Sequence, residues 1–187
     1  MPSSIAPWIS SLLAAAALSP LLAGTPGEGG RAPDFALVSL RGHTVRLSEA
    51  LSKQTVVLVV LRGYPGYQCP ICNRQVQEFI GNAQRFLDAG ARVIMVYPGP
   101  PQDLGAKAQE FTADKKLPEN FDLVLDPGYE FTNLYGLRWD AARETAYPST
   151  FLIDQRGVVF FAKVSKSHGD RSRAADIIEI LKKNAAR

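Results

Sequence analysis

Apolar and polar residues are arranged along the chain in short blocks, and their spacing changes repeatedly from that of a strand to that of a helix. Residues 35–47 alternate around a polar turn and predict a short hairpin, which a brief helix at 48–51 follows. Two uninterrupted apolar runs, 55–61 and 92–97, are typical of strands buried on both faces of a sheet. A third, shorter strand is expected at 123–125.

Several later segments carry apolar residues at helical spacing instead. They are residues 70–89, 104–111, 129–135 and a closing helix at 170–184. Residues 150–153 and 158–162 predict a hairpin around the turn 154–157. Strands that alternate with helices and end in a hairpin predict an α/β fold with a central mixed sheet flanked by helices. This order is the one expected of a thioredoxin-like fold.

The first thirty residues differ in composition from the rest. Residues 8–23 are almost wholly apolar and are consistent with a secretory signal peptide or with a helix lying on the domain. No Lys or Arg precedes them, and no clear cleavage motif follows. They are too short, and contain Pro20, so we expect no membrane span. Residues 25–30 form a Gly-rich linker, and 31–187 form the folded domain. Exported or periplasmic and cytoplasmic locations both stay open.

The charge balance gives little reason to expect nucleic acid as a partner. The chain has 21 basic and 18 acidic residues, a formal net charge of +3. The basic residues between Lys163 and Arg173 are expected to form a solvated face rather than a binding patch. Only two cysteines are present, too few for the multi-bridge framework of a small secreted domain.

The pair Cys69 and Cys72 is the strongest chemical signal in the sequence. Cys69 is expected just before the helix that begins at Pro70, and Cys72 in its first turn. The unpaired N–H groups and dipole at a helix start favour the thiolate, which is the reactive form. The three-residue spacing of Cys69 and Cys72 also lets the two sulfurs meet as a disulfide. We therefore predict a reversible dithiol–disulfide switch in which Cys69 and Cys72 are catalytic.

Three other interpretations of the cysteine pair compete with a catalytic one. A zinc site needs further ligands, and the chain has neither another cysteine nor a paired His-x-His segment, so no metal and no other cofactor is expected. A purely structural disulfide would close too short a loop to restrain the unfolded chain strongly. Two buried free thiols would fit a non-catalytic redox sensor or a binding module.

Short motifs elsewhere accompany the cysteine pair. They are Ala32-Pro33-Asp34-Phe35, Leu47-Ser48, Arg62-Gly63, Leu125-Asp126-Pro127, Leu134-Tyr135-Gly136-Leu137 and the segment 148–154. In combination they resemble the peroxiredoxin-like (AhpC/TSA, redoxin) branch of the thioredoxin superfamily, over roughly residues 30–181. The resemblance implies a thioredoxin-like fold, reduction of small peroxides and an external thiol reductant such as a thioredoxin-type donor.

The resemblance has two departures at the site. Peroxiredoxins carry Pro-x-x-x-Thr-x-x-Cys, ending in the cysteine that attacks peroxide. Here Pro65 and Cys72 are in register, and Cys69 takes the place of the threonine. Pro148 stands where the family has an activating arginine and where thioredoxins have a cis-proline. The resemblance thus implies that Pro65 and Pro148 belong to the substrate site, that the Tyr147–Pro148 bond is cis, and that Pro148 packs against the cysteines.

The missing threonine and arginine would supply donors to the leaving oxygen of a peroxide. Arg62, Arg138 and Arg143 could replace them, but we expect each on the surface, where most arginines lie. No role is predicted for Trp139 and His168.

Two enzymatic functions therefore compete: a thiol-dependent peroxidase of antioxidant type, and a thioredoxin-like reductase or oxidase of protein disulfides. Alignment with the peroxiredoxin motif makes Cys72 the attacking sulfur, whereas alignment with the Cys-x-x-Cys motif of thioredoxins makes Cys69 the attacking sulfur. We expect the roles to divide by substrate, with Cys72 attacking peroxide and Cys69 attacking disulfides, because only a small peroxide reaches a recessed sulfur.

Overall fold

The structure, a computed structural model, describes residues 24–186 and is built around one five-stranded sheet with the strand order β5–β4–β3–β6–β7. Strands β3 and β4 run parallel, as do β4 and β5, whereas β6 is antiparallel to both β3 and β7. The bounds of these strands are Thr55–Val60 (β3), Ala91–Gly99 (β4), Phe121–Pro127 (β5), Ser149–Ile153 (β6) and Val159–Val164 (β7). The predicted mixed sheet flanked by helices is confirmed.

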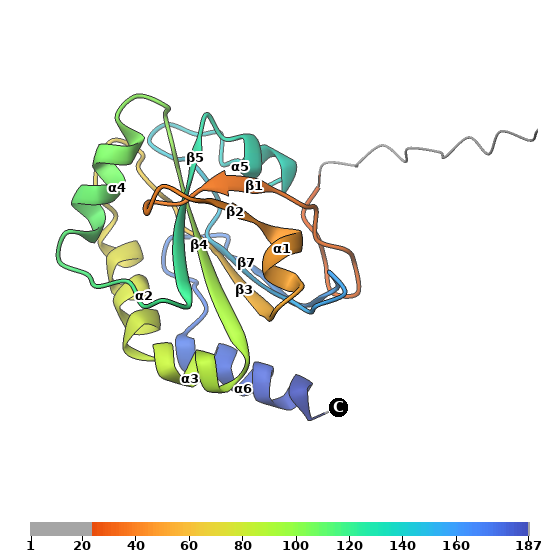
Figure 1. The fold of residues 1–187 in the computed structure, drawn as a ribbon. Helices are drawn as coiled ribbons and strands as arrows, with labels where there is room; N and C mark the ends of the chain where they lie inside the picture. The colour runs from red at the N-terminus through yellow and green to blue at the C-terminus, as the bar shows by residue number, and fades with distance from the viewer. Residues whose placement is uncertain (1–23, 187) are drawn as a thin grey trace, which may run out of the picture.

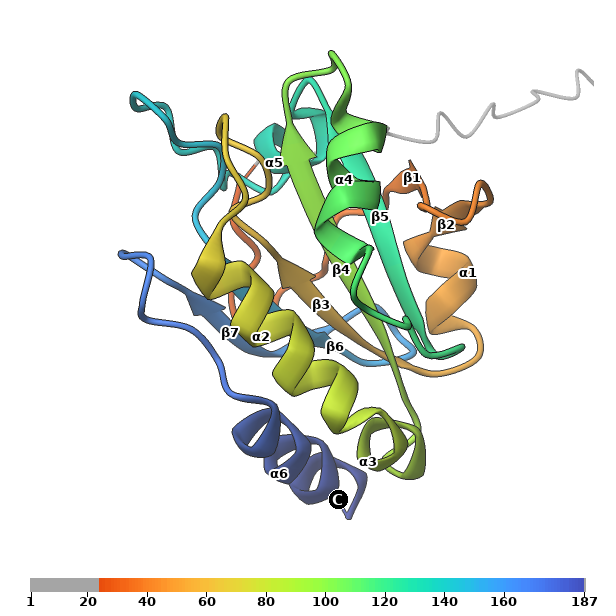
Figure 2. The same cartoon turned by 90° about the vertical axis from the view of Figure 1, so that its left-hand side faces the viewer.

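Helices cover both faces of the sheet (Figures 1 and 2). One face packs against α2 (Pro70–Gly81), α3 (Ala83–Asp88), α4 (Leu104–Thr112) and α6 (Ala174–Ala185). The other face packs against α1 (Leu47–Leu51), α5 (Glu130–Leu134) and the hairpin of β1 (Ala36–Val38) and β2 (Thr44–Arg46). Residues of β3 and β4 alternate between the two cores, which explains why both strands are uninterrupted apolar runs.

Several boundaries differ from the prediction, and β5 is longer than the expected strand 123–125. The helix expected over 70–89 is broken at Asn82, whose side chain binds the Glu78 carbonyl and accepts from Arg85. Strand β4 continues through Pro98 and Gly99, beyond the apolar run 92–97 that predicted it. Helix α6 begins at Ala174 rather than at Asp170, so residues 165–173 form a loop after β7. This last difference matters most, because that loop approaches the cysteines.

The N-terminal part of the described chain is held on the domain. Gly29 donates to the Val159 carbonyl, and Thr25 donates to the Gly136 carbonyl. The Gly-rich segment predicted as a linker thus lies along the ends of β7 and α5. The apolar segment 8–23, predicted as a signal peptide or a helix, lies outside the described residues. No helix within 24–186 is long and apolar enough to cross a membrane.

The loop between β3 and α2 is fixed at both of its ends. Gly63 has φ +69°, and a side chain there would collide with the Pro98 carbonyl of β4. Nearer the helix, Gln68 accepts from the Tyr97 hydroxyl at 2.8 Å and donates to the Lys107 carbonyl at 2.9 Å. The start of α2 is thereby anchored to both β4 and α4.

Candidate active site

The two cysteines lie at the start of α2, as predicted. Cys69 is the N-cap residue, Pro70 is the first helical residue, and Cys72 lies in the first turn. The Cys72 backbone N–H donates to Cys69 Sγ over 3.4 Å, so the sulfur takes the place that a Ser or Asp oxygen usually has at an N-cap. Both residues are free cysteines in this structure. The helix start therefore stabilises negative charge on the Cys69 sulfur.

The two thiols have opposite acidities. Hydrogen bonding by the Cys72 thiol, helped by the N–H groups of the helix start and the charge of Arg171, lowers the pKa of Cys69 to about 5 although burial opposes this. Burial raises the pKa of Cys72, and the neighbouring Cys69 raises it further. At neutral pH the pair therefore consists of a Cys69 thiolate and a protonated Cys72 thiol.

A hollow of about 410 Å³ opens beside Cys69 between α2 and the end of α4. Its walls include the apolar side chains of Pro70 and Phe111 together with the polar side chain of Asn73. Both cysteines are buried, but Cys69 is 3% exposed and lines the hollow, whereas Cys72 is completely buried and does not. A substrate in this hollow would meet the Cys69 sulfur first.

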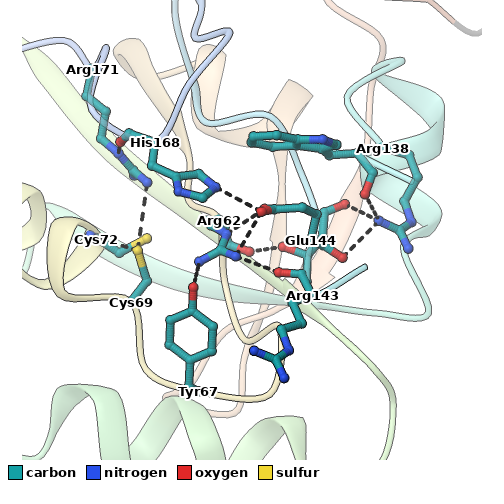
Figure 3. A network of polar contacts seen from close by, with 11 residues as sticks. Arg62, Tyr67, Cys69, Cys72, Arg138, Arg143, Glu144, His168 and Arg171 are labelled. Atoms are coloured by element: carbon teal, nitrogen blue, oxygen red, sulfur yellow. Dashed lines mark hydrogen bonds and ion pairs between the residues drawn. The ribbon is translucent and has the colours of Figure 1, made fainter. Parts of the chain in front are cut away.

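Arg171 approaches Cys69 from the other side, out of the loop after β7 (Figure 3). Its Nη2 atom lies 3.9 Å from Cys69 Sγ, and its Nη1 atom donates to Gln75 of α2 at 3.0 Å. Sequence reasoning missed this residue, because it grouped Arg171 with a solvated basic face. The apolar spacing typical of a helix begins only at Ala174, where α6 starts. That spacing is the signal in the sequence that could have placed Arg171 on a loop.

A buried ion-pair network lies next to the cysteines (Figure 3). Arg62 is 2% exposed and donates to Glu144 at 2.6 Å and to the Tyr67 hydroxyl. His168 contacts the same carboxylate at 2.9 Å. Although burial opposes ionisation, the hydrogen bonds from Arg62 and His168 lower the pKa of Glu144. The expectation of a surface position was therefore wrong for Arg62, whose guanidinium is buried because a carboxylate compensates it.

The other two candidate arginines lie elsewhere. Arg143 is exposed, as expected, and its carbonyl accepts from Arg62 at 2.5 Å. Arg138 is half-buried over the ring of Tyr129, 4.2 Å from its centroid, and donates to the Thr145 carbonyl. Among the described residues, neither side chain forms a hydrogen bond to a cysteine sulfur.

Pro65 and Pro148 flank the same end of the sheet. Pro65 is half-buried in the loop before α2, and Pro148 is buried directly before β6, whose first residue pairs with the last residue of β3. The prediction of a cis bond at Pro148 is wrong, because every peptide bond within 24–186 is trans. Backbone hydrogen bonds hold the chain on both sides of this bond: the Tyr147 N–H donates to the Leu137 carbonyl, and the Pro148 carbonyl accepts from the Ser165 N–H. The Tyr147 ring stacks on Trp139, with 4.7 Å between the ring centroids.

No group of three or more His, Cys, Asp or Glu side chains in the described part of the chain is arranged to hold a metal ion. The chemistry that this site offers is that of sulfur: an acidic thiol at the wall of a hollow, and a fully buried protonated thiol next to it.

Comparison with known proteins identifies related chains. The model of the AhpC/TSA family matches residues 29–162. Peroxiredoxin Q from the chloroplast of Oryza sativa subsp. japonica is 31% identical over 139 residues, which cover 74% of this chain and 59% of the rice protein. The chain thus spans less than two thirds of the length of that relative.

Solved structures give the same fold. Peroxidoxin BcpB from Mycobacterium tuberculosis superposes with a TM-score of 0.65 over 87% of this chain and 99% of its own, at 23% identity. A protein from Chlorobium tepidum assigned as thiol:disulfide interchange protein DsbE has a TM-score of 0.61 over 87% of this chain and 97% of its own, at 25% identity. The thioredoxin-like architecture is therefore shared with both kinds of protein.

Proposed function

The chain belongs to the AhpC/TSA family, and we propose that it is a thiol-dependent peroxidase that reduces small peroxides. We assign Cys69 as the attacking sulfur and Cys72 as the resolving one. The supporting observation is the asymmetry of the two thiols. Cys69 has a pKa of about 5 and lines the hollow, whereas Cys72 is fully buried with a raised pKa. A thiolate attacks peroxide far faster than a thiol.

This assignment differs from the division of roles expected from the sequence, in which Cys72 attacked peroxide. A sulfur that is completely buried and protonated is a poor nucleophile even for a small substrate. The same features suit Cys72 to the second step, in which it needs to meet only its neighbour.

The proposed steps balance as follows. The Cys69 thiolate attacks the terminal peroxide oxygen, the O–O bond breaks, and the alkoxide or hydroxide takes a proton from water and leaves as alcohol or water. Cys69 is then a sulfenic acid. The Cys72 sulfur attacks it as its own proton is removed, the S–O bond breaks, and water leaves as the Cys69–Cys72 disulfide forms. An external dithiol, such as a thioredoxin-type donor, reduces this disulfide by thiol exchange.

Substrate choice is the test that separates this function from disulfide exchange. The reduced protein is mixed in single turnover with hydrogen peroxide or with a small disulfide, and free thiols are counted by quenching with an alkylating agent. We expect thiol loss to be faster with peroxide, with a Cys69→Ser/Cys72→Ser double variant as the unreactive control. Faster oxidation by the disulfide would assign the site to thioredoxin-like exchange instead.

A further inference from the structure

Arg171 is the charged group nearest to the proposed attacking sulfur, and no carboxylate neutralises it. Its Nη2 atom lies 3.9 Å from Cys69 Sγ, and its other hydrogen bonds go to neutral acceptors, the Gln75 side chain and the His168 carbonyl. In the described part of the chain Arg171 has no ion pair with Asp or Glu. An unneutralised guanidinium at this distance favours the negative form of the sulfur.

The charged groups on either side of Cys69, in the hollow and in the Arg62 network, are already paired. On the hollow side, Glu110 binds Lys107 at 3.0 Å, and Lys115 binds Asp114 at 2.5 Å. On the far side, the Arg62 side chain is bound by Glu144, which His168 also contacts. The other titratable neighbour is Cys72, which is protonated at neutral pH. Arg171 is therefore the positive charge that contacts the Cys69 sulfur without a carboxylate partner among the described residues.

The loop that carries Arg171 is fastened to the domain on both sides of it. Before Arg171, His168 binds the buried Glu144, and Lys163 of β7 binds Asp170 at 2.7 Å. After it, the Ser172 carbonyl accepts from Gln75 at 3.2 Å. Gln75 thus binds the arginine through its oxygen and the adjacent backbone through its nitrogen. This double contact fixes the guanidinium relative to α2, the helix that carries Cys69.

We propose that Arg171 is a further catalytic residue, which stabilises the Cys69 thiolate and the negative charge that develops on the leaving oxygen of the peroxide, and that Gln75 is the residue that positions it. The proposal rests on Cys69 being the attacking sulfur. Arg171 donates hydrogen bonds and remains charged throughout, so the proton for the leaving alcohol comes from water. The arginine comes from the loop after β7, not from the start of β6, where Pro148 stands.

The test measures the acidity of Cys69 without any peroxide. Reduced full-length protein is alkylated with iodoacetamide between pH 4 and pH 9, and the rate at the Cys69 peptide is followed by mass spectrometry. In Arg171→Met the thiolate loses its charged neighbour, so at pH 5 the rate should fall roughly tenfold and the profile should move to higher pH. Arg171→Lys keeps the charge and should recover part of the rate.

Two further variants separate a catalytic role from a structural one. Arg173→Met removes an exposed arginine two residues away, which pairs with Asp176, and should leave the Cys69 profile unchanged. Gln75→Leu should move the profile in the same direction as Arg171→Met but less far, because the arginine stays present. An unchanged profile in folded Arg171→Met, or the same shift in Arg173→Met, would overturn the proposal. Because no peroxide is used, this result does not depend on whether peroxide or a disulfide is the substrate.

Discussion

The backbone N–H of Cys72 donates to the sulfur of Cys69 over 3.4 Å, across the first turn of α2. One cysteine therefore caps the helix that buries the other. This relationship makes the pair unequal before any substrate arrives, because the capping sulfur gains stabilisation as an anion while the buried one loses hydration.

The first prediction concerns the redox state of the pair. Mild oxidation of the reduced protein should give a single Cys69–Cys72 disulfide, because the two residues are adjacent in the first turn and no other cysteine exists in the chain. Mass spectrometry of the peptide should show the loss of two hydrogen atoms. Two alkylatable thiols after the same treatment would mean that the pair does not form the proposed switch.

The second prediction is the pH dependence of Cys69. Its pKa is lowered to about 5, so the thiolate is present above that pH and is lost as the pH falls through it. The alkylation rate at Cys69 should thus be half-maximal near pH 5. It should reach its plateau well before pH 8, a pH at which an ordinary thiol is still titrating. Cys72 should stay unreactive over this range because burial raises its pKa. A half-point above about pH 8 would contradict the capping argument.

The third prediction concerns the buried ion pair. Glu144→Gln removes the carboxylate from Arg62, which is 2% exposed, and should lower the free energy of unfolding by about 3–5 kcal/mol. Urea denaturation measures this change. Asp140→Asn is the matched control, because its carboxylate also faces an arginine, Arg138, but its side chain is 94% exposed and should contribute about 0–1 kcal/mol. Equal effects of the two variants would show that the Arg62 pair is not specially stabilising.

The fourth prediction tests the hollow as the route to Cys69. Ala113 lines the hollow and is exposed, so Ala113→Trp should obstruct it without disturbing the core. Oxidation by a bulky organic hydroperoxide should slow by about tenfold, and oxidation by hydrogen peroxide should change less. Ala106→Trp, at an exposed position of α4 outside the hollow, is the control. If both variants leave the bulky substrate unaffected, that substrate reaches Cys69 by another path.

Much of the fold could be predicted because its signals are local. The runs that form β3 and β4 are apolar throughout since both strands are buried between two layers, and Cys69 and Cys72 follow β3 at a helix start. The capping geometry at Cys69 follows from that position alone.

The charged part of the site could not be predicted from local pattern. Arg171 lies 102 residues from Cys69 in sequence, and their contact depends on how the loop after β7 packs on α2. Arg62 is buried because Glu144, 82 residues away, compensates its charge. Such long-range pairings have no periodicity that a single sequence reveals.

The central claim, that Cys69 attacks peroxide and Cys72 resolves it, is tested most directly by trapping sulfenic acid in the two single variants. Reduced Cys72→Ser and Cys69→Ser are each treated with one equivalent of hydrogen peroxide in the presence of dimedone, and the adduct is located by mass spectrometry. We predict a rapid adduct at Cys69 in Cys72→Ser and little at Cys72 in Cys69→Ser. A rapid adduct at Cys72 in Cys69→Ser, with Cys72→Ser inert, would contradict the account and make Cys72 the attacking sulfur.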